Sequence, residues 1–202
     1  MNALHCQRCG ARTTRAVPAD DNRLRDLCGE CGFVHYENPR PVAACLIESE
    51  GGILLCRRAI EPRVNYWTAP GGYVEVGESF QEGARRECWE EAEARVSVDA
   101  LQAVLDIPHI GQAYAIFRGT LSEPGFGVGV ESLETRLFPI DELPWDELAF
   151  PVLQFALQWY VEERAAGTPH VHVASIAWKG SGDRYDAANY DVGDHLATPV
   201  HP

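Results

Sequence analysis

Residues 72–94 constrain the fold of this chain more than any other segment, because they combine a glycine turn, a helix start and a group of acids. The segment reads GYVEVGESFQEGARRECWEEAEA. Ser79 and Glu82 form a capping box, which predicts a helix over about 79–92. An apolar stripe runs along this helix, made of Phe80, Ala84, Cys88 and Ala92. The helix is therefore predicted to pack one face on a sheet and to leave another face reachable.

Three glutamates, Glu87, Glu90 and Glu91, share one side of the predicted helix, because residues three and four positions apart are neighbours. Like charges at this spacing repel, and the segment contains no lysine to balance them. Hard divalent cations prefer carboxylate oxygens, so the cluster predicts a bound cation. Arg86 is expected to hold these carboxylates in place, with Glu78 as one candidate partner. The alternative is a solvated acidic helix face without a ligand.

Four cysteines near the N-terminus form two CxxC pairs. They are Cys6, Cys9, Cys28 and Cys31. The eighteen residues between the two pairs fall within the spacing of four-cysteine zinc sites. Thiolates suit this soft, tetrahedral ion, so we predict a structural Zn²⁺, with the flanking His5 and His35 as further ligand candidates. A redox role is the alternative for a CxxC pair, but no thioredoxin-like pattern surrounds these two.

The composition limits the partners and the location of the chain. Its 202 residues include thirty acidic and seventeen basic side chains, which give a formal net charge of −13. This excess of negative charge argues against general binding to nucleic acid or to an anionic membrane. No apolar run reaches the length of a membrane-spanning helix, and the first ten residues lack the apolar core of a secretory signal. We therefore expect a cytoplasmic protein without a membrane partner.

The chain is expected to contain three parts. Residues 1–37 would form the zinc ribbon, which is too short to bury much core and would take its folding energy from the metal. Residues 38–180 would form the main domain. Residues 181–202 are rich in glycine, aspartate and alanine and have little to bury, so we expect a poorly ordered tail.

Apolar periodicity and turn signals predict the elements of the main domain. The expected strands cover 42–48, 53–58, 95–106, 112–121, 133–140 and 171–178. A second helix is expected over 151–165, with proline in its first turn and Gly167 beyond its end. Strands mixed with two helices predict an α/β fold in which helices pack on a mixed sheet.

The pattern G-x5-E-x7-R-E-x-x-E-E, from Gly72 to Glu91, resembles the signature of the Nudix hydrolases. The family pattern has a bulky aliphatic residue where Cys88 and Ala94 stand and a glycine where Glu93 stands. These departures concern how the helix packs and ends. The resemblance covers about 40–165 and implies the Nudix fold, an α/β/α sandwich. The preceding zinc ribbon and the runs 35–41 and 67–72 are similar to a subgroup of dinucleotide pyrophosphatases acting on NADH, ADP-ribose or FAD.

The resemblance implies an enzyme that hydrolyses the diphosphate of a nucleoside diphosphate derivative into two phosphate-bearing products. Mg²⁺ (or Mn²⁺), held by the three helix glutamates and by the Gly72 carbonyl, would neutralise and orient the phosphates. A water molecule would attack, and a carboxylate of the cluster or of a loop would accept its proton. The family often recruits a further glutamate as ligand or base. Glu131, which follows the glycine-rich loop 125–129, is the candidate for this role. The alternative is a solvated loop residue.

Substrate contacts are less constrained by the sequence. Arg57 and Arg58 end a strand and are candidates for phosphate contact, with surface ion pairs as the alternative. Trp67 is a candidate for stacking on a base, with a core position as the alternative. His109 lies in a turn near the expected cleft. The region 106–112 lacks the SQPWPFP-like run of relatives that prefer NADH, so ADP-ribose or FAD is expected, with NADH still open.

Three other interpretations remain open at this stage. The first is a catalytically idle Nudix domain that senses a nucleotide, although the complete set of Arg86 and the three glutamates argues against it. In the second, the ribbon binds protein or nucleic acid and dominates the function. The third is hydrolysis of a modified nucleoside triphosphate to a monophosphate and pyrophosphate. The family commonly forms dimers, so a homodimer is expected by analogy.

Overall fold

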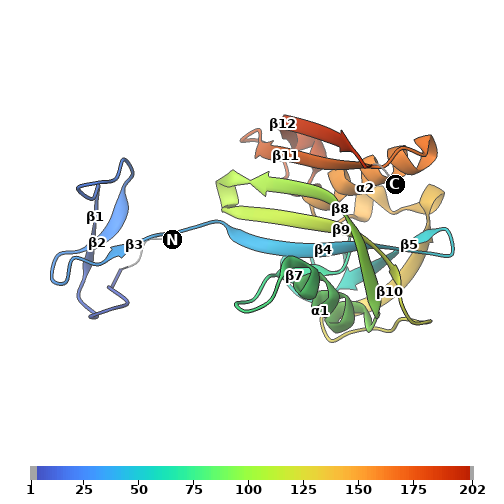
Figure 1. Cartoon of the computed structure of the whole chain (residues 1–202), viewed down its shortest axis with the longest axis horizontal. Helices are drawn as coiled ribbons and strands as arrows, with labels where there is room; N and C mark the ends of the chain where they lie inside the picture. The colour runs from blue at the N-terminus through green and yellow to red at the C-terminus, as the bar shows by residue number, and fades with distance from the viewer. Residues whose placement is uncertain (1–3, 201–202) are drawn as a thin grey trace. The chain divides into compact units, whose positions relative to one another are not determined.

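The computed structural model describes residues 4–200, which separate into two compact units (Figure 1). The first unit ends at Asn38, and the second begins at Pro39. The first holds the paired cysteines, and the second holds the helix that carries the glutamates. No helix among these residues is long and apolar enough to cross a bilayer.

The N-terminal unit is a small antiparallel sheet with two cysteine-bearing turns. Its strands are β1 (Thr13–Ala16), β2 (Arg25–Cys28) and β3 (Val34–His35), in the order β1-β2-β3. In each turn the residue after the second cysteine is a glycine with positive φ, +78° at Gly10 and +69° at Gly32. The amides of these glycines donate to the carbonyls of Cys6 and Cys28 at 2.8 and 3.0 Å. The two turns thus bring both pairs of thiols to one place.

A mixed sheet forms the centre of the second unit. Its long strands are β4 (Arg40–Ser49), β5 (Gly52–Arg58), β8 (Val96–Ile107), β9 (Gln112–Leu121), β10 (Ser132–Pro139), β11 (His170–Trp178) and β12 (Tyr190–Pro199). They lie in the order β10-β5-β4-β9-β8-β11-β12, and the short strands β6 (Trp67–Thr68) and β7 (Gly71–Tyr73) pair with β5 and β4. The pairs β4–β9 and β8–β11 are parallel, and the other pairs along this path are antiparallel. The predicted mixed sheet is therefore confirmed.

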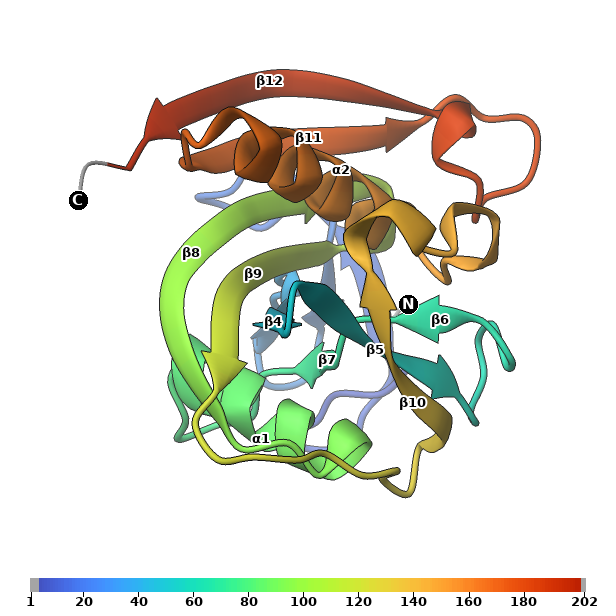
Figure 2. The same ribbon diagram turned by 90° about the vertical axis from the view of Figure 1, so that its right-hand side faces the viewer.

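One helix covers each face of this sheet, which confirms the α/β/α arrangement (Figure 2). Side chains along β4 alternate between the two faces: Ala43 and Cys45 pack with α1 (Phe80–Ala92), and Ala44 and Leu46 pack with α2 (Pro151–Ala166). Four short 3₁₀ helices complete the unit, η1 (Pro108–Ile110), η2 (Ile140–Glu142), η3 (Trp145–Glu147) and η4 (Ala187–Asn189). The strands and helices expected from the sequence all appear, with ends shifted by at most two residues.

Both ends of α1 follow from local sequence. Ser79 Oγ accepts from the Glu82 amide at 3.3 Å, and the Glu82 carboxylate accepts from the Ser79 amide at 2.7 Å, so the predicted capping box is confirmed. At the other end, Glu93 adopts a left-handed conformation with φ of +47°, and the Ala94 amide donates to the Cys88 carbonyl at 3.1 Å. Glu93 thus takes the conformation that glycine adopts more easily at this position of a helix end.

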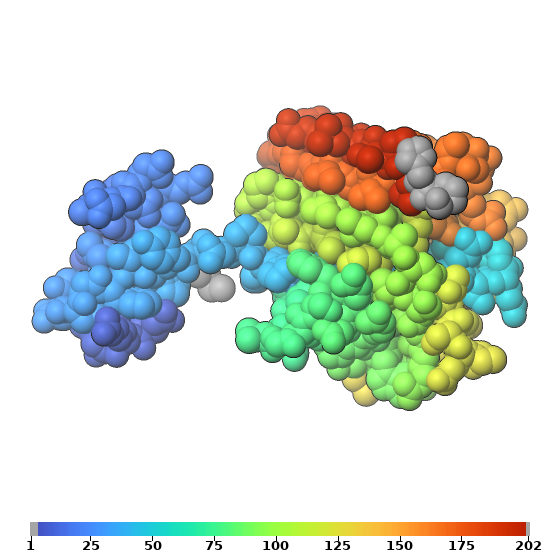
Figure 3. Space-filling model, viewed as in Figure 1, coloured from blue at the N-terminus to red at the C-terminus, as the bar shows by residue number. Residues whose placement is uncertain are grey.

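The C-terminal segment corrects one expectation from the sequence. We expected a poorly ordered tail over 181–202, but Tyr190–Pro199 forms β12, antiparallel to β11 at the edge of the sheet. Figure 3 shows β12, in red, on the surface of the second unit. Glycine and aspartate are rare in strands, so the composition of this segment does not predict one. The pairing with β11 satisfies its backbone, and the rings of Tyr190 and His195 pack on His109 and Trp159.

Candidate active site

The acidic face of α1 opens into a cavity of about 840 Å³. Glu87, Glu90 and Glu91 line it, together with Gly72 and Glu131. The three helix glutamates differ in exposure, from 5 % for Glu91 through 12 % for the Glu87 side chain to 49 % for the Glu90 side chain. The structure therefore brings the predicted acids together at one cavity, in a series that runs from buried to exposed.

Glu91 is the buried member of this series. Its Oε2 accepts a hydrogen bond from the Gly71 amide at 3.1 Å. Burial raises the pKa of Glu91 to about 8, and the negative charge of Glu87 adds to this effect, although the Gly71 amide opposes it. The charge of Arg58 also opposes the rise without cancelling it, and a bound cation would supply further positive charge.

Glu87 lies directly against the backbone of Gly72. Gly72 belongs to β7, which pairs with β4 through Ala43. A Cβ at position 72 would stand 2.5 Å from Glu87 Oε1, closer than any real contact allows. Burial also raises the pKa of Glu87, while the neighbouring Arg86 lowers it. The Glu87 carboxylate can occupy this position only because Gly72, the first residue of the signature, has no side chain.

We expect Gly72→Ala to lower kcat about 100-fold, because a displacement of about 1 Å at a catalytic group has this effect. The added methyl group would push the Glu87 carboxylate away from β7. The kcat with Mg²⁺ and the melting temperature measure the two effects separately. Gly29→Ala is the matched control, because an added Cβ there meets nothing within 4 Å. A kcat equal to that of the wild type would show that this carboxylate position does not matter.

Arg86 joins three carboxylates and one backbone carbonyl. Its Nε and Nη2 donate to Glu78 at 3.1 and 2.8 Å, which confirms the expected contact between these residues. Its Nη1 donates to Glu87 at 2.7 Å and to Glu90 at 2.9 Å, and Nη2 also donates to the Tyr73 carbonyl at 3.0 Å. The Arg86 guanidinium lowers the pKa of Glu78 to about 2, so this pair remains charged. Glu78 is not among the lining residues of the cavity, and its contact with the site is through Arg86.

The glutamates do not already form a closed cage for a single ion. Within residues 4–200, the four cysteines are the one group of metal-ligand side chains whose donor atoms lie within 4.8 Å of one another. Arg86 binds the Glu87 and Glu90 carboxylates, so these would turn partly away from it when a cation binds. The donors are all carboxylate oxygens at an open cavity, and the pKa values of two of them are raised. This donor set fits a hard divalent cation.

The glycine-rich loop is fixed to the end of α1. The Gly127 amide donates to the Ala92 carbonyl at 2.7 Å, and the Gly129 amide donates to the Glu91 carbonyl at 3.1 Å. Ser132 Oγ donates to the same Glu91 carbonyl at 2.7 Å. The loop thus satisfies carbonyls that a helix end leaves unpaired. It also places Glu131 at the cavity, where its charge adds to burial in raising the pKa of Glu87 and Glu91.

Two of the four candidate substrate contacts lie outside the cavity lining. Arg57 forms an ion pair with Glu134 at 3.7 Å and donates to the Asn65 carbonyl at 3.1 Å. Trp67 is buried in the core, with its ring in edge contact with Phe138 at 4.8 Å between centroids. The alternatives of a surface ion pair and a core aromatic are therefore the better interpretations of these two residues.

The other two candidates, Arg58 and His109, do line the cavity. Arg58 is buried, and its Nε donates to the Pro62 carbonyl at 2.8 Å, so it braces the loop after β5. Its guanidinium also lies over the Phe150 ring at 5.0 Å. His109 is exposed in η1 and faces two rings of the C-terminal hairpin, Trp178 and Tyr190.

The sequence does not predict the wall of the cavity that the C-terminal segment contributes. This wall includes Trp178, Arg184, Tyr185 and Tyr190. The last three fall in the expected tail, and Trp178 is predicted only as the end of a strand. The signal was present in the alternating strand that ends at Trp178, followed by the turn-rich run 180–189 and a second aromatic residue, which together indicate a hairpin.

The four paired thiols fit a zinc ion. Cys6 Sγ lies 3.7 Å from Cys31 Sγ, and Cys9 Sγ lies 3.5 Å from Cys28 Sγ. Zinc–sulfur bonds of about 2.3 Å in a tetrahedron place the sulfur atoms about 3.8 Å apart. The backbone amide of Cys31 lowers the pKa of the Cys28 thiol, which favours the thiolate that zinc requires. Neither flanking histidine belongs to this group.

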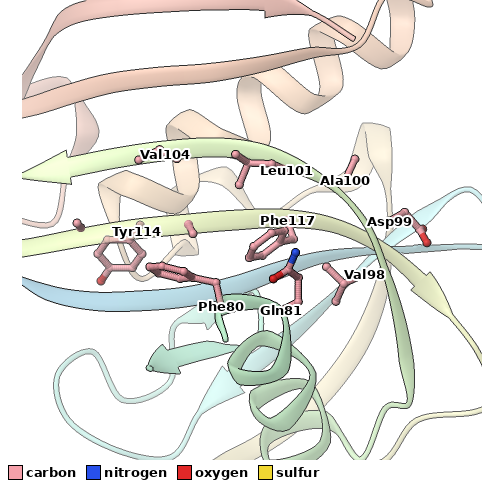
Figure 4. Close-up of a pocket in the computed structure, with 11 residues that line it drawn as sticks. Phe80, Gln81, Val98, Asp99, Ala100, Leu101, Val104, Tyr114 and Phe117 are labelled. Carbon is pink, nitrogen blue, oxygen red and sulfur yellow. The ribbon is translucent and has the colours of Figure 1, made fainter. Parts of the chain in front are cut away.

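A second hollow, of about 590 Å³, lies between the start of α1 and the strands β8 and β9. Figure 4 shows Phe80 of α1 lying close to Tyr114 and Phe117 of β9 there. Its lining is mostly apolar and includes none of the predicted site residues. The larger, acidic cavity is therefore the candidate active site.

Comparison with protein families finds two matching models. The NUDIX domain model matches residues 38–156, and the Nudix N-terminal model, a zinc ribbon, matches residues 5–37. A MutT-like protein of Streptomyces ambofaciens is 35 % identical over 94 residues, which are 46 % of this chain and 57 % of that protein. The NAD-capped RNA hydrolase NudC of Vibrio vulnificus is 32 % identical over 92 residues, 46 % of this chain and 33 % of that protein. The chain spans less than two thirds of the length of these curated relatives.

Solved structures with the same fold extend this comparison. A Nudix hydrolase from Nitrosomonas europaea is 41 % identical and has a TM-score of 0.81. The alignment covers 87 % of this chain and 99 % of that one. A UDP-X diphosphatase is 27 % identical with a TM-score of 0.54, and the alignment covers 65 % of this chain and 66 % of that one. The signature-bearing unit and the cysteine-bearing unit therefore both have their counterparts in a known family.

Proposed function

The chain belongs to the Nudix family, and from this premise we propose that it hydrolyses the diphosphate bond of a nucleoside diphosphate derivative into two phosphate-bearing products. The substrates that we propose are ADP-ribose and FAD, with NADH as a further member of the same class. The observation that carries the proposal is the single cavity that joins the acids of α1 to a wall of aromatic rings. Such a cavity suits a molecule with phosphates at one point and a planar ring at another.

Glu87, Glu90 and Glu91 are the residues that would hold Mg²⁺ or Mn²⁺, and the Gly72 carbonyl is a further candidate ligand. The cation, when bound, supplies positive charge that offsets the charge of the diphosphate. Arg86 holds the Glu87 and Glu90 carboxylates at the cavity before a cation binds, and both would turn partly from it towards the cation. A carboxylate at the cavity, either in the α1 cluster or Glu131, accepts the proton of the attacking water.

The experiment that tests this proposal is a substrate panel with Mg²⁺ in which every product is identified by mass. We expect AMP and ribose 5-phosphate from ADP-ribose, and AMP and FMN from FAD. Release of pyrophosphate from nucleoside triphosphates, without turnover of these dinucleotides, would instead support a triphosphate pyrophosphohydrolase. Tight nucleotide binding without any turnover would support an idle sensor.

A second candidate substrate comes from the relatives named NAD-capped RNA hydrolases. The net charge of −13 opposes binding of an RNA chain, because RNA binding depends on neutralising phosphates with basic side chains. We therefore propose that the free dinucleotide is turned over faster than an RNA that carries it as a cap. Comparing free NAD⁺ with an NAD-capped oligonucleotide at equal concentration and at two salt concentrations tests this order.

A further inference from the structure

We propose that the C-terminal hairpin of β11 and β12 forms the binding site for a planar heteroaromatic ring of the substrate. The site consists of Trp178, Tyr190 and His109, which we call the aromatic wall. This inference rests on the proposed function, because it assigns the part of the substrate that lies beyond the diphosphate. The NUDIX domain model ends at residue 156, so the hairpin lies outside the part of the chain that the family defines.

The topology of the sheet explains why these three residues meet. Trp178 ends β11 and Tyr190 begins β12, and the two are direct cross-strand partners, so their side chains project from the same face. β11 also runs parallel to β8, with Ser175 opposite Asp106. Beyond this pair β11 continues to Trp178 and β8 leads into η1, where the ring of His109 contacts that of Trp178. Segments far apart in the sequence are thus placed side by side at one end of the sheet.

The rings lie close together and remain accessible from the cavity. The ring centroids of His109 and Trp178 are 6.5 Å apart with an angle of 28° between planes. Those of His109 and Tyr190 are 5.9 Å apart at 44°. All three residues line the cavity that contains Glu87, Glu90 and Glu91, and His109 is exposed while the other two are half-buried. Part of their aromatic surface is therefore available to a ligand in the same cavity as the acids.

Hydrogen bonds within the hairpin hold its turn in one conformation. The Tyr190 hydroxyl donates to the Arg184 carbonyl at 2.7 Å. The Lys179 amide donates to the Asn189 carbonyl and its Nζ to the Ala188 carbonyl, both at 2.9 Å. The Arg184 guanidinium lies 5.8 Å from the centre of the Trp178 ring. A surface fixed in advance loses less conformational entropy when a ligand binds.

The chemistry of the wall selects a flat π-system. Aromatic side chains stack on the faces of heterocycles and make few demands on the groups at their edges. Adenine and the isoalloxazine ring of a flavin both offer such a face. The phosphorylated halves of the proposed substrates separate these sources, because AMP carries adenine, FMN carries isoalloxazine, and ribose 5-phosphate carries no aromatic ring.

The test is the dissociation constant of AMP, FMN and ribose 5-phosphate, measured by calorimetry with the full-length wild type and Trp178→Ala. We expect the substitution to weaken AMP, FMN or both by about 5-fold to 150-fold, the range for loss of one stacking ring. The nucleotide affected identifies the ring. The affinity for ribose 5-phosphate should not change, and this result also reports that the rest of the cavity is intact. Trp178→Phe, which retains a flat ring, should recover most of the affinity.

If Trp178→Ala binds AMP and FMN as tightly as the wild type does, the aromatic wall is not a ring-binding site. A wild type that binds neither nucleotide would refute the proposal as well. If Trp178→Ala melts at a much lower temperature, Tyr190→Ala provides the same comparison from the other strand. Turnover separates this inference from the proposed function. A wild type that binds AMP through Trp178 but hydrolyses no diphosphate would refute the enzyme and retain the wall. Normal turnover with an unchanged KM in Trp178→Ala would retain the enzyme and refute the aromatic wall.

Discussion

Glu91→Gln is expected to lower kcat for ADP-ribose or FAD by about 100-fold to 1000-fold. This is the loss that follows removal of one preorganised electrostatic group. Glutamine cannot supply a carboxylate to a cation, so the charge that offsets the diphosphate would be lost. The fold should remain intact, because the side chain is isosteric and its amide oxygen can still accept from the Gly71 amide. Burial already raises the pKa of Glu91 to about 8, so the neutral glutamine resembles the form that burial favours in the metal-free protein.

The matched control for this substitution is Glu82→Gln on the same helix. It makes the same change in charge, and glutamine can replace glutamate in a capping box. We expect near-normal kcat from the control and equal melting temperatures for both variants. Equal loss of activity in the two variants would attribute the effect to the charge of the helix instead of the site. Full activity in Glu91→Gln would place the chemistry elsewhere.

Cys28→Ser is expected to remove zinc from the protein and to unfold the N-terminal unit. Four thiols surround one point, and the unit contains only three short strands, so the metal supplies most of its folding free energy. Structural zinc contributes about 10–16 kcal/mol in zinc-finger peptides, far more than a sheet of this size can replace. Zinc per chain by mass spectrometry and the amide spectrum of residues 4–38 measure the two effects.

His35→Ala is the control for the cysteine substitution, because His35 flanks the cysteines without belonging to their group. Its zinc content should equal that of the wild type. The second unit has its own core, so turnover per folded chain should change less than zinc content in Cys28→Ser. Normal zinc and a normal spectrum in Cys28→Ser would contradict a structural role. Loss of turnover with normal zinc would point to a catalytic one.

Local signals explain why so much of the fold follows from the sequence. The helix that bears the glutamates begins at a capping box, and both of its residues lie within one turn. The strands alternate or form short apolar runs between turn residues, so their ends were predicted to within two residues. The contact between Arg86 and Glu78 also follows from short spacing, since the two lie at the start and middle of one segment. Each of these features depends on neighbours in the sequence.

Features that depend on distant contacts were not predictable in the same way. The three helix glutamates are alike in sequence, yet β7 buries Glu91 and leaves Glu90 half exposed. Strand β12 has a composition that disfavours strands, and it forms because β11 pairs with it. Trp67 begins the short strand β6 and Trp178 ends the long strand β11, but the first packs on Phe138 and the second lines the cavity. Tertiary packing decides each of these outcomes.

The position of the metal can be measured by anomalous scattering from Mn²⁺ in a crystal that also contains ADP-ribose or its product AMP. We expect Mn²⁺ within about 2.5 Å of carboxylate oxygens of Glu87 and Glu91, with a phosphate oxygen of the ligand as a further partner. We also expect the ion in the cavity that Gly72 and Glu131 line. A phosphate-bound ion elsewhere, with these side chains still directed at Arg86 and Gly71, would contradict this expectation.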